Sequence, residues 1–118
     1  MSATKPVRRI TIADIARMYE EGERFATITA YDFPTARIVD EAGIPLILVG
    51  DSLGMVMLGY DTTVRVNIDE MIHHTRAVAR GAKHALVVGD MPFLTYGVST
   101  EESVEHAGRF LSEAYAQA

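Results

Sequence analysis

Leu46-Ile47-Leu48-Val49-Gly50-Asp51-Ser52 joins an apolar run to a polar turn. The run is continuous rather than alternating, which is typical of a strand that is covered on both faces in a parallel sheet. Leu86-Val87-Val88-Gly89-Asp90 repeats the pattern further along the chain. The repetition predicts two equivalent buried strands, each followed by an exit turn that carries an aspartate.

Helix and strand signals precede the first of these strands. Thr11-Ile12-Ala13-Asp14 has the spacing of a capping box and predicts a helix that ends at Gly22. The apolar residues of this helix follow at helical spacing: Ile12, Ile15, Ala16 and Tyr19. Residues 25–30 then form a short β-favouring run, and Pro34 suits the first turn of a second helix that should stop at Gly43.

Two more helices are expected further along the chain. Asn67 and Glu70 form a second possible capping box, which opens a helix that closes at Gly81. Its predicted apolar face consists of Ile68, Met71, Ile72, Thr75 and Val78. Ser99 and Glu102 predict a last helix, inside which the chain ends. The predicted apolar face of that helix consists of Val104, Ala107, Gly108, Leu111, Ala114 and Tyr115.

These elements make one helix followed by three strand-helix units, in a single domain of residues 1–118. We expect residues 1–9 to be a flexible leader, residues 10–22 to hold the N-terminal helix, and residues 25–118 to form the three units. Such alternation predicts an α/β fold with parallel strands joined by right-handed crossovers. Both a (β/α)₈ barrel and an open doubly wound sheet satisfy this pattern.

The composition is that of an ordinary soluble domain, with 48% hydrophobic and 23% charged residues. A net charge of −5 argues against nucleic acid as a partner, because binding phosphates requires a basic patch. The sequence has no cysteine, which removes disulfides and thiolate metal sites and favours a cytoplasmic location. No apolar run approaches the ~20 residues of a membrane span, so we expect neither membrane binding nor a targeting signal.

The chemistry is expected at the strand exits. Carboxyl ends of parallel strands lie on one face and adjacent strands are about 4.8 Å apart, so Asp51 and Asp90 can reach one cation. Two carboxylates, with water and substrate completing the shell, are a usual way to hold Mg²⁺. Ser52 would stand beside them as a hydrogen-bonding group. The alternative is that each aspartate only caps a helix or fixes a turn, and the matched pair favours the metal site.

Other polar residues are weaker candidates. His73 and His74 are consecutive on a helix, so their side chains diverge by about 100° and are expected on a solvated face rather than on one metal. Tyr31 and Asp32 follow the first strand and either face the same cavity or serve as turn and cap. The glycine-rich segment 50–59 lacks the spacing of a nucleotide loop and is expected to turn over the site.

The chain resembles the ketopantoate hydroxymethyltransferase family from about Ile10 to its last residue. Four motifs in the family's order and spacing carry the resemblance: residues 25–32 (FATITAYD), 49–55 (VGDSLGM), 59–63 (GYDTT) and 90–93 (DMPF) with Tyr96. The resemblance implies a (β/α)₈ barrel of the phosphoenolpyruvate/pyruvate type, preceded by a short helix. This chain would form its N-terminal part, with about three strands. It also implies a large cytoplasmic homo-oligomer.

The resemblance further implies which residues act. Acids at the positions of Asp51 and Asp90 bind Mg²⁺ in the family, and a serine at the position of Ser52 contacts the keto acid, so these three are the expected substrate-binding residues. The implied reaction transfers a hydroxymethyl group from 5,10-methylenetetrahydrofolate to 3-methyl-2-oxobutanoate. It gives 2-dehydropantoate (ketopantoate), on the way to pantothenate and coenzyme A, through a Mg²⁺-stabilised enolate.

The family places the general base, the lysine that binds the substrate carboxylate and a third acid near the metal beyond the position of Ala118. We therefore expect no general base in this chain, and the 118-residue chain alone to be inactive and poorly folded, with its third strand an exposed edge. Two alternatives stay open. One is a Mg²⁺-binding, receiver-like α/β signalling domain, and the other is a non-catalytic fragment that serves as an interaction module.

Overall fold

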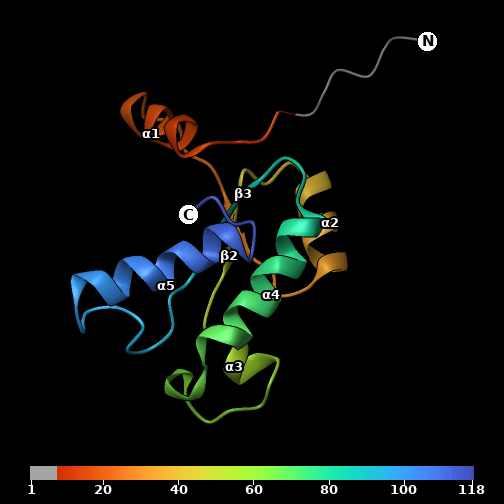
Figure 1. Ribbon diagram of the computed structural model, residues 1–118. Coiled ribbons are helices and arrows are strands. Elements are labelled where there is room, and N and C mark those ends of the chain that lie inside the picture. Colours follow the sequence, from red (N-terminus) through yellow and green to blue (C-terminus); the bar gives the residue numbers. More distant parts are fainter. Residues whose placement is uncertain (1–7) are drawn as a thin grey trace.

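The structure is a computed structural model that describes residues 8–118, so residues 1–7 of the predicted leader lie outside the described residues. A parallel sheet of three strands lies at its centre, and the helices lie around it (Figure 1). The strands are β1 (Thr27–Thr29), β2 (Leu46–Val49) and β3 (Leu86–Gly89), in that spatial order. Ile28 stands opposite Ile47, and Ile47 stands opposite Val87. The predicted α/β class with parallel strands is confirmed.

The helices begin close to the predicted caps. The elements are α1 (Ile12–Glu20), α2 (Phe33–Glu41), α3 (Leu53–Val56), the 3₁₀ helix η1 (Thr63–Arg65), α4 (Ile68–Gly81) and α5 (Thr100–Ser112). Both predicted capping boxes are present: the Thr11 hydroxyl accepts from the Asp14 N–H, the Asn67 side chain accepts from the Glu70 N–H, and each acid reaches back. These local signals therefore set the starts of α1 and α4.

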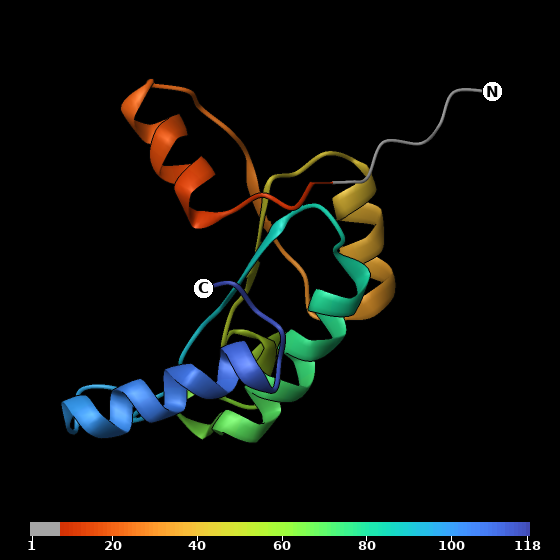
Figure 2. The same ribbon diagram turned by 45° about the horizontal axis from the view of Figure 1, so that its top comes forward.

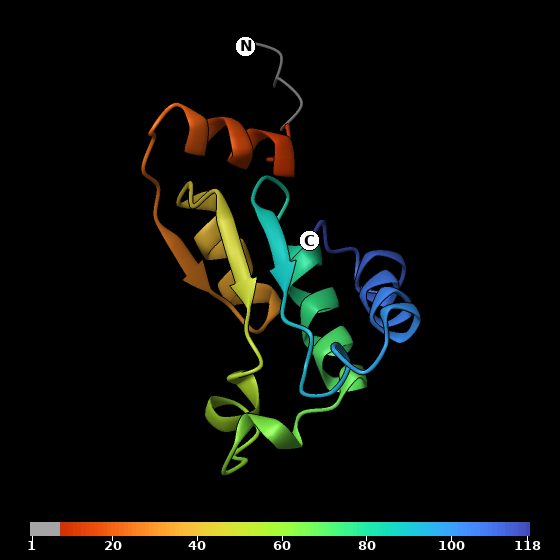
Figure 3. The same cartoon turned by 90° about the vertical axis from the view of Figure 1, so that its left-hand side faces the viewer.

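The core lies between strands β2 and β3 and the α2–α4 pair, which covers the same side of the sheet (Figure 3). Ile47, Val87, Met71 and Val78 are fully buried, and each such side chain contributes about 1.5–3 kcal/mol by leaving water. The predicted apolar face of α4 is confirmed. α2 and α4 approach so closely that a Cβ at Gly81 would lie 2.6 Å from the Phe33 carbonyl oxygen.

One carboxylate and one guanidinium hold the turn between α4 and β3. Asp40 accepts backbone N–H bonds from Lys83, His84 and Ala85 at 3.0, 3.0 and 2.6 Å. Arg9 donates to the carbonyls of Ala82 and Ala85, and the backbone N–H of the residue after it donates to the His84 carbonyl. The donors and acceptors of this turn are thus satisfied, and the chain entering α1 is fixed beyond the amino ends of the strands (Figure 3).

The apolar faces predicted for the first and last helices are mostly exposed. In α1, Ile12 and Tyr19 are 63% and 86% exposed, and the buried residue is Asp14, which binds the Arg8 guanidinium. In α5 only Phe110 is buried and Val104 is 66% exposed, whereas Ala114 of the predicted face is buried just beyond the end of the helix. The apolar residues of α5 are exposed because the helix contacts the sheet only through its last turn and otherwise projects away from it (Figure 2).

The prediction that the chain ends inside the last helix is also wrong. The left-handed conformation of Tyr115, with φ of 60°, turns the chain back toward β3 after α5 has ended. The N–H of Ala118 donates to the Val87 carbonyl at 3.4 Å, and the N–H of Gly89 donates to the Ala118 carbonyl at 3.0 Å. Residues 117–118 therefore cover part of the outer edge of β3, so the expectation of an exposed edge is wrong for Val87 and Gly89.

Within residues 8–118, no helix combines the length and the apolar character that crossing a membrane requires.

Candidate active site

The carboxyl ends of β2 and β3 bring the two predicted aspartates together. Val49 and Gly89 are opposite each other in the sheet, and each is followed within two residues by an aspartate. The backbone N–H of Asp51 donates to the Asp90 Oδ2 at 3.1 Å, and the Asp90 N–H donates to the Val49 carbonyl at 3.0 Å. The predicted juxtaposition is therefore present, and the metal-binding role of the pair stays a prediction.

The electrostatics of this pair favour a bound cation. Burial, followed by the charge of nearby Asp90, raises the pKa of the Asp51 carboxyl above its usual value. Carboxylate oxygens are the donors that Mg²⁺ prefers, and a divalent cation would remove the repulsion between them. No group of three or more His, Asp or Glu side chains able to hold a metal occurs within residues 8–118. The pair accordingly fits Mg²⁺ as a partial ligand set.

Ser52 lies next to the acid pair and faces a tyrosine from the neighbouring strand. It directly precedes α3, and its side chain makes no capping bond to that helix. The Ser52 Oγ is instead 2.9 Å from the Tyr31 hydroxyl. Gly50 leaves the space for this cluster, since a Cβ there would be 3.2 Å from the Ser52 Oγ and 3.5 Å from the Asp90 Oδ2.

Tyr31 and Asp32, which follow β1 and Ala30, have different roles. Asp32 caps α2 by accepting the Thr35 N–H at 2.8 Å, so the cap alternative holds for it. The Tyr31 hydroxyl instead lies 2.9 Å from the Ser52 Oγ, and whether it faces a substrate cavity stays a prediction. Sequence position pointed to Tyr31 because it follows β1 as Asp51 follows β2, and the exits of parallel strands share one face.

The two histidines of α4 also differ from each other. His73 is exposed, as predicted, but His74 is half-buried and its Nδ1 donates to the Tyr31 carbonyl oxygen at 2.8 Å. The solvated-face prediction is therefore wrong for His74. Its spacing carries the signal that was missed, because it stands three residues after buried Met71 and four before buried Val78, at the margin of the apolar face.

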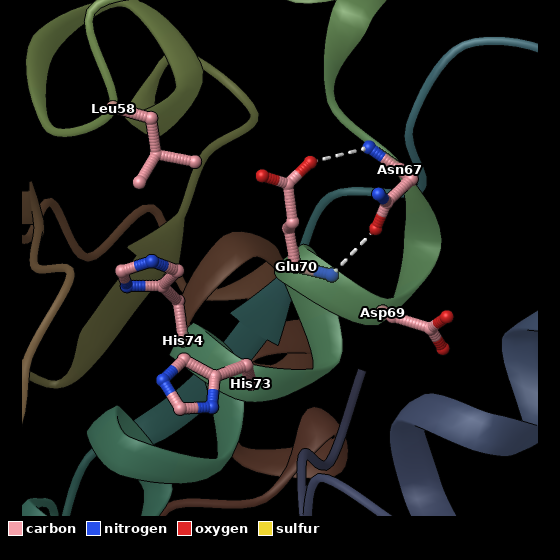
Figure 4. Close-up of a pocket in the computed structure, with 6 residues that line it drawn as sticks. All are labelled: Leu58, Asn67, Asp69, Glu70, His73 and His74. Carbon is pink, nitrogen blue, oxygen red and sulfur yellow. Dashed lines mark hydrogen bonds between the residues drawn. The ribbon is translucent and has the colours of Figure 1, made fainter.

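An open pocket of about 430 Å³ lies beside His74, lined by Leu58, Asn67, Asp69, Glu70, His73 and His74 (Figure 4). Its central carboxylate is already used, because Glu70 accepts the Asn67 N–H at 3.0 Å and the Tyr60 hydroxyl at 2.5 Å. Asp51, Ser52 and Asp90 do not line this pocket. Glu70 thus anchors the loop before α4, and the acid pair forms a separate group.

Comparison with known proteins places this arrangement in one family. The sequence model of the family described as ketopantoate hydroxymethyltransferase matches residues 9–118. The chain belongs to the ketopantoate hydroxymethyltransferase family. The family resemblance of the four sequence motifs is confirmed, and Asp51, Ser52 and Tyr31 all lie inside the part that matches the ketopantoate hydroxymethyltransferase model.

Relatives within the ketopantoate hydroxymethyltransferase family carry the name 3-methyl-2-oxobutanoate hydroxymethyltransferase. The protein from Chloroflexus aggregans is 64% identical over 110 residues, which are 93% of this chain and 39% of the relative. A Dehalococcoides mccartyi protein is 54% identical over 110 residues, which are again 93% of this chain and 39% of the relative. The Syntrophus aciditrophicus protein is 52% identical over 118 residues, or 43% of its length. The chain thus spans about two fifths of the length of these transferases.

Proposed function

We propose that this chain supplies the metal-binding and keto-acid-binding part of a 3-methyl-2-oxobutanoate hydroxymethyltransferase. The proposed reaction transfers a hydroxymethyl group from 5,10-methylenetetrahydrofolate to 3-methyl-2-oxobutanoate and yields 2-dehydropantoate. One observation carries the proposal: the Asp51 N–H bonds the Asp90 carboxylate at the exits of adjacent parallel strands, in a chain that belongs to this family.

We propose that the complete fold is a (β/α)₈ barrel. Sequential strand order supports it, because β1-β2-β3 with α2 and α4 on one side of the sheet is how a barrel begins. A receiver-like domain has the order 2-1-3-4-5, in which β1 and not β2 lies beside β3. The pairing of Ala118 with β3 is a further support, since a fourth barrel strand would start there.

In this proposal Asp51 and Asp90 hold Mg²⁺, and Ser52 donates a hydrogen bond to an oxygen of the keto acid. When bound, Mg²⁺ supplies Lewis acidity that makes the C–H next to the keto group easier to deprotonate. Asp51, Ser52 and Asp90 are half-buried, so a metal and a substrate can reach them from solvent. We assign no general base to the described residues and expect it elsewhere in the full-length protein.

The test is a chimera in which residues 9–118 replace the matching segment of the Chloroflexus aggregans relative. We expect Mg²⁺-dependent formation of 2-dehydropantoate, reversible loss of turnover with a chelator, and a loss of about 100-fold or more in Asp90→Asn. An inactive chimera beside an active parent, or an Asp90→Asn variant with unchanged Mg²⁺ dependence, would contradict the proposal.

Further parts of the proposal rest on the family resemblance. We propose a cytoplasmic homo-oligomer that uses the folate as a cosubstrate. We also expect the 118-residue chain by itself to show no measurable transferase activity, because it lacks an assigned base, and a general base is worth about 10²–10⁴-fold. Turnover by the purified chain near that of the chimera would contradict this part.

A further inference from the structure

The hydroxyl of Ser52 has a single side-chain partner among the described residues. Ser52 has αR backbone dihedrals, with φ of −56° and ψ of −16°, rather than the extended conformation typical of a capping serine. Its hydroxyl makes no bond to the first turn of α3. The Tyr31 hydroxyl, at 2.9 Å, is what fixes the direction of the Ser52 side chain.

Tyr31 itself is held on a rigid base. Its side chain is half-buried and packs against the hydrophobic core, and the backbone N–H of Ala30 before it donates to the Leu48 carbonyl at 3.2 Å. The Tyr31 carbonyl accepts from His74 Nδ1 at 2.8 Å. A carbonyl only accepts hydrogen bonds, so Nδ1 carries a proton and the contact holds for both the neutral and the charged ring. Strand β1 and helix α4 together fix the tyrosine.

We propose that Tyr31 is a positioning residue. Its hydroxyl donates a hydrogen bond to the Ser52 Oγ, and this leaves the Ser52 O–H free to donate a hydrogen bond to the keto acid. This inference rests on the proposed function. Either hydroxyl could donate in the Tyr31–Ser52 contact. An anionic substrate selects one direction, because a hydrogen bond from Ser52 to a carboxylate or polarised keto oxygen is stronger than one to a neutral phenol. Donation from Tyr31 then polarises Ser52 further.

The test uses Tyr31→Phe in the chimera, which keeps the ring and removes the hydroxyl. Losing one hydrogen bond of about 0.5–1.5 kcal/mol raises the KM and the calorimetric Kd for 3-methyl-2-oxobutanoate by about 2- to 12-fold. The calorimetric Kd for Mg²⁺ without keto acid and the thermal midpoint stay within error of the parent. In a Ser52→Ala background, Tyr31→Phe has no further effect on the keto acid, because the group it positions is gone.

Tyr60→Phe is the matched control, since it also removes a phenolic hydroxyl with a side-chain partner, in this case Glu70. We expect it to lower the thermal midpoint and to leave the Kd for the keto acid unchanged in both serine backgrounds. An equal loss of keto-acid affinity from Tyr31→Phe with and without Ser52 would overturn the inference, as would no loss at all or a loss seen only in the thermal midpoint.

The outcome separates this inference from the proposed function. A parent chimera that forms product and binds the keto acid keeps the proposed function, and only the Tyr31–Ser52 coupling then decides the inference. A parent chimera that neither turns over nor binds 3-methyl-2-oxobutanoate in calorimetry would overturn the proposed function and the inference with it.

Discussion

The backbone N–H of Asp51 donates a hydrogen bond to the Asp90 carboxylate at 3.1 Å, so the backbone of one aspartate stabilises the charge of the other. The compensation is incomplete, since burial and the Asp90 charge still raise the pKa of Asp51. Ionised Asp51 therefore destabilises the folded chain at neutral pH.

From this we predict opposite effects of Asp51→Asn on stability and on metal binding. A raised folded-state pKa means that Asp51 lowers stability above that pKa, and that the penalty disappears as the pH falls through it. In the chimera with chelator present, Asp51→Asn should raise the thermal midpoint at pH 8 and change it less at pH 5, while calorimetry shows weakened Mg²⁺ binding. A lower midpoint at pH 8 would show that the carboxylate stabilises the fold.

Gly50→Ala should weaken keto-acid binding more than Mg²⁺ binding. The added Cβ would lie 3.2 Å from the Ser52 Oγ, which is closer than an ordinary contact, and 3.5 Å from the Asp90 Oδ2, which is an ordinary one. Ser52 must therefore move, and we expect the Kd for 3-methyl-2-oxobutanoate to rise by about 10-fold, the equivalent of about 1.4 kcal/mol. Titration calorimetry with each ligand measures both affinities, and a selective loss of Mg²⁺ affinity would be the opposite result.

Gly81→Ala should destabilise the protein through backbone crowding between α2 and α4. Its Cβ would meet the Phe33 carbonyl oxygen at 2.6 Å, and backbone cannot move aside as a flexible side chain does. Overpacking of this kind costs about 1–3 kcal/mol. Gly108→Ala in α5 is the matched control, since its Cβ meets nothing within 4 Å and the helix gains up to about 1 kcal/mol. Denaturant unfolding of both variants checks the opposite signs.

Asp40→Ala should unfold the turn between α4 and β3. Three backbone N–H groups lose their acceptor, two of them at partly buried bonds, and leaving a buried donor unsatisfied costs about 1–3 kcal/mol. The neighbouring Glu41→Ala is the control, because its exposed pair with Arg37 at 3.9 Å is worth about 0–1 kcal/mol. Hydrogen exchange at Lys83, His84 and Ala85 should accelerate in the first variant only, and equal protection in both would refute this role.

The sequence predicted those features that depend on neighbouring residues. The continuous apolar run 46–49 predicted a strand, although burial alternates along it rather than covering both faces. Asn67 with Glu70 predicted the start of α4, since both signals act within a few residues. The acid pair followed from the rule that parallel strands end on one face.

Features that depend on distant contacts were missed. The apolar positions of α5 are spaced for a helix, but burial also requires a surface opposite them, and Val104 meets none in this structure. The spacing of His74 indicates its half-burial, but its bond to the Tyr31 carbonyl joins different elements and no local pattern encodes it. The pairing of Ala118 with β3 requires the turn at Tyr115, a non-glycine residue with positive φ that propensities do not predict.

The contacts of Arg9 have a consequence for the order of events during synthesis. Arg9 is made early, yet its guanidinium binds the carbonyls of Ala82 and Ala85 and lies 3.4 Å from the Gln117 side chain, 108 positions away. The carbonyls of Ala82 and Ala85 are synthesised 73 and 76 residues after Arg9. The segment that leads into α1 is therefore fixed only after α2, β2 and α4 have been synthesised.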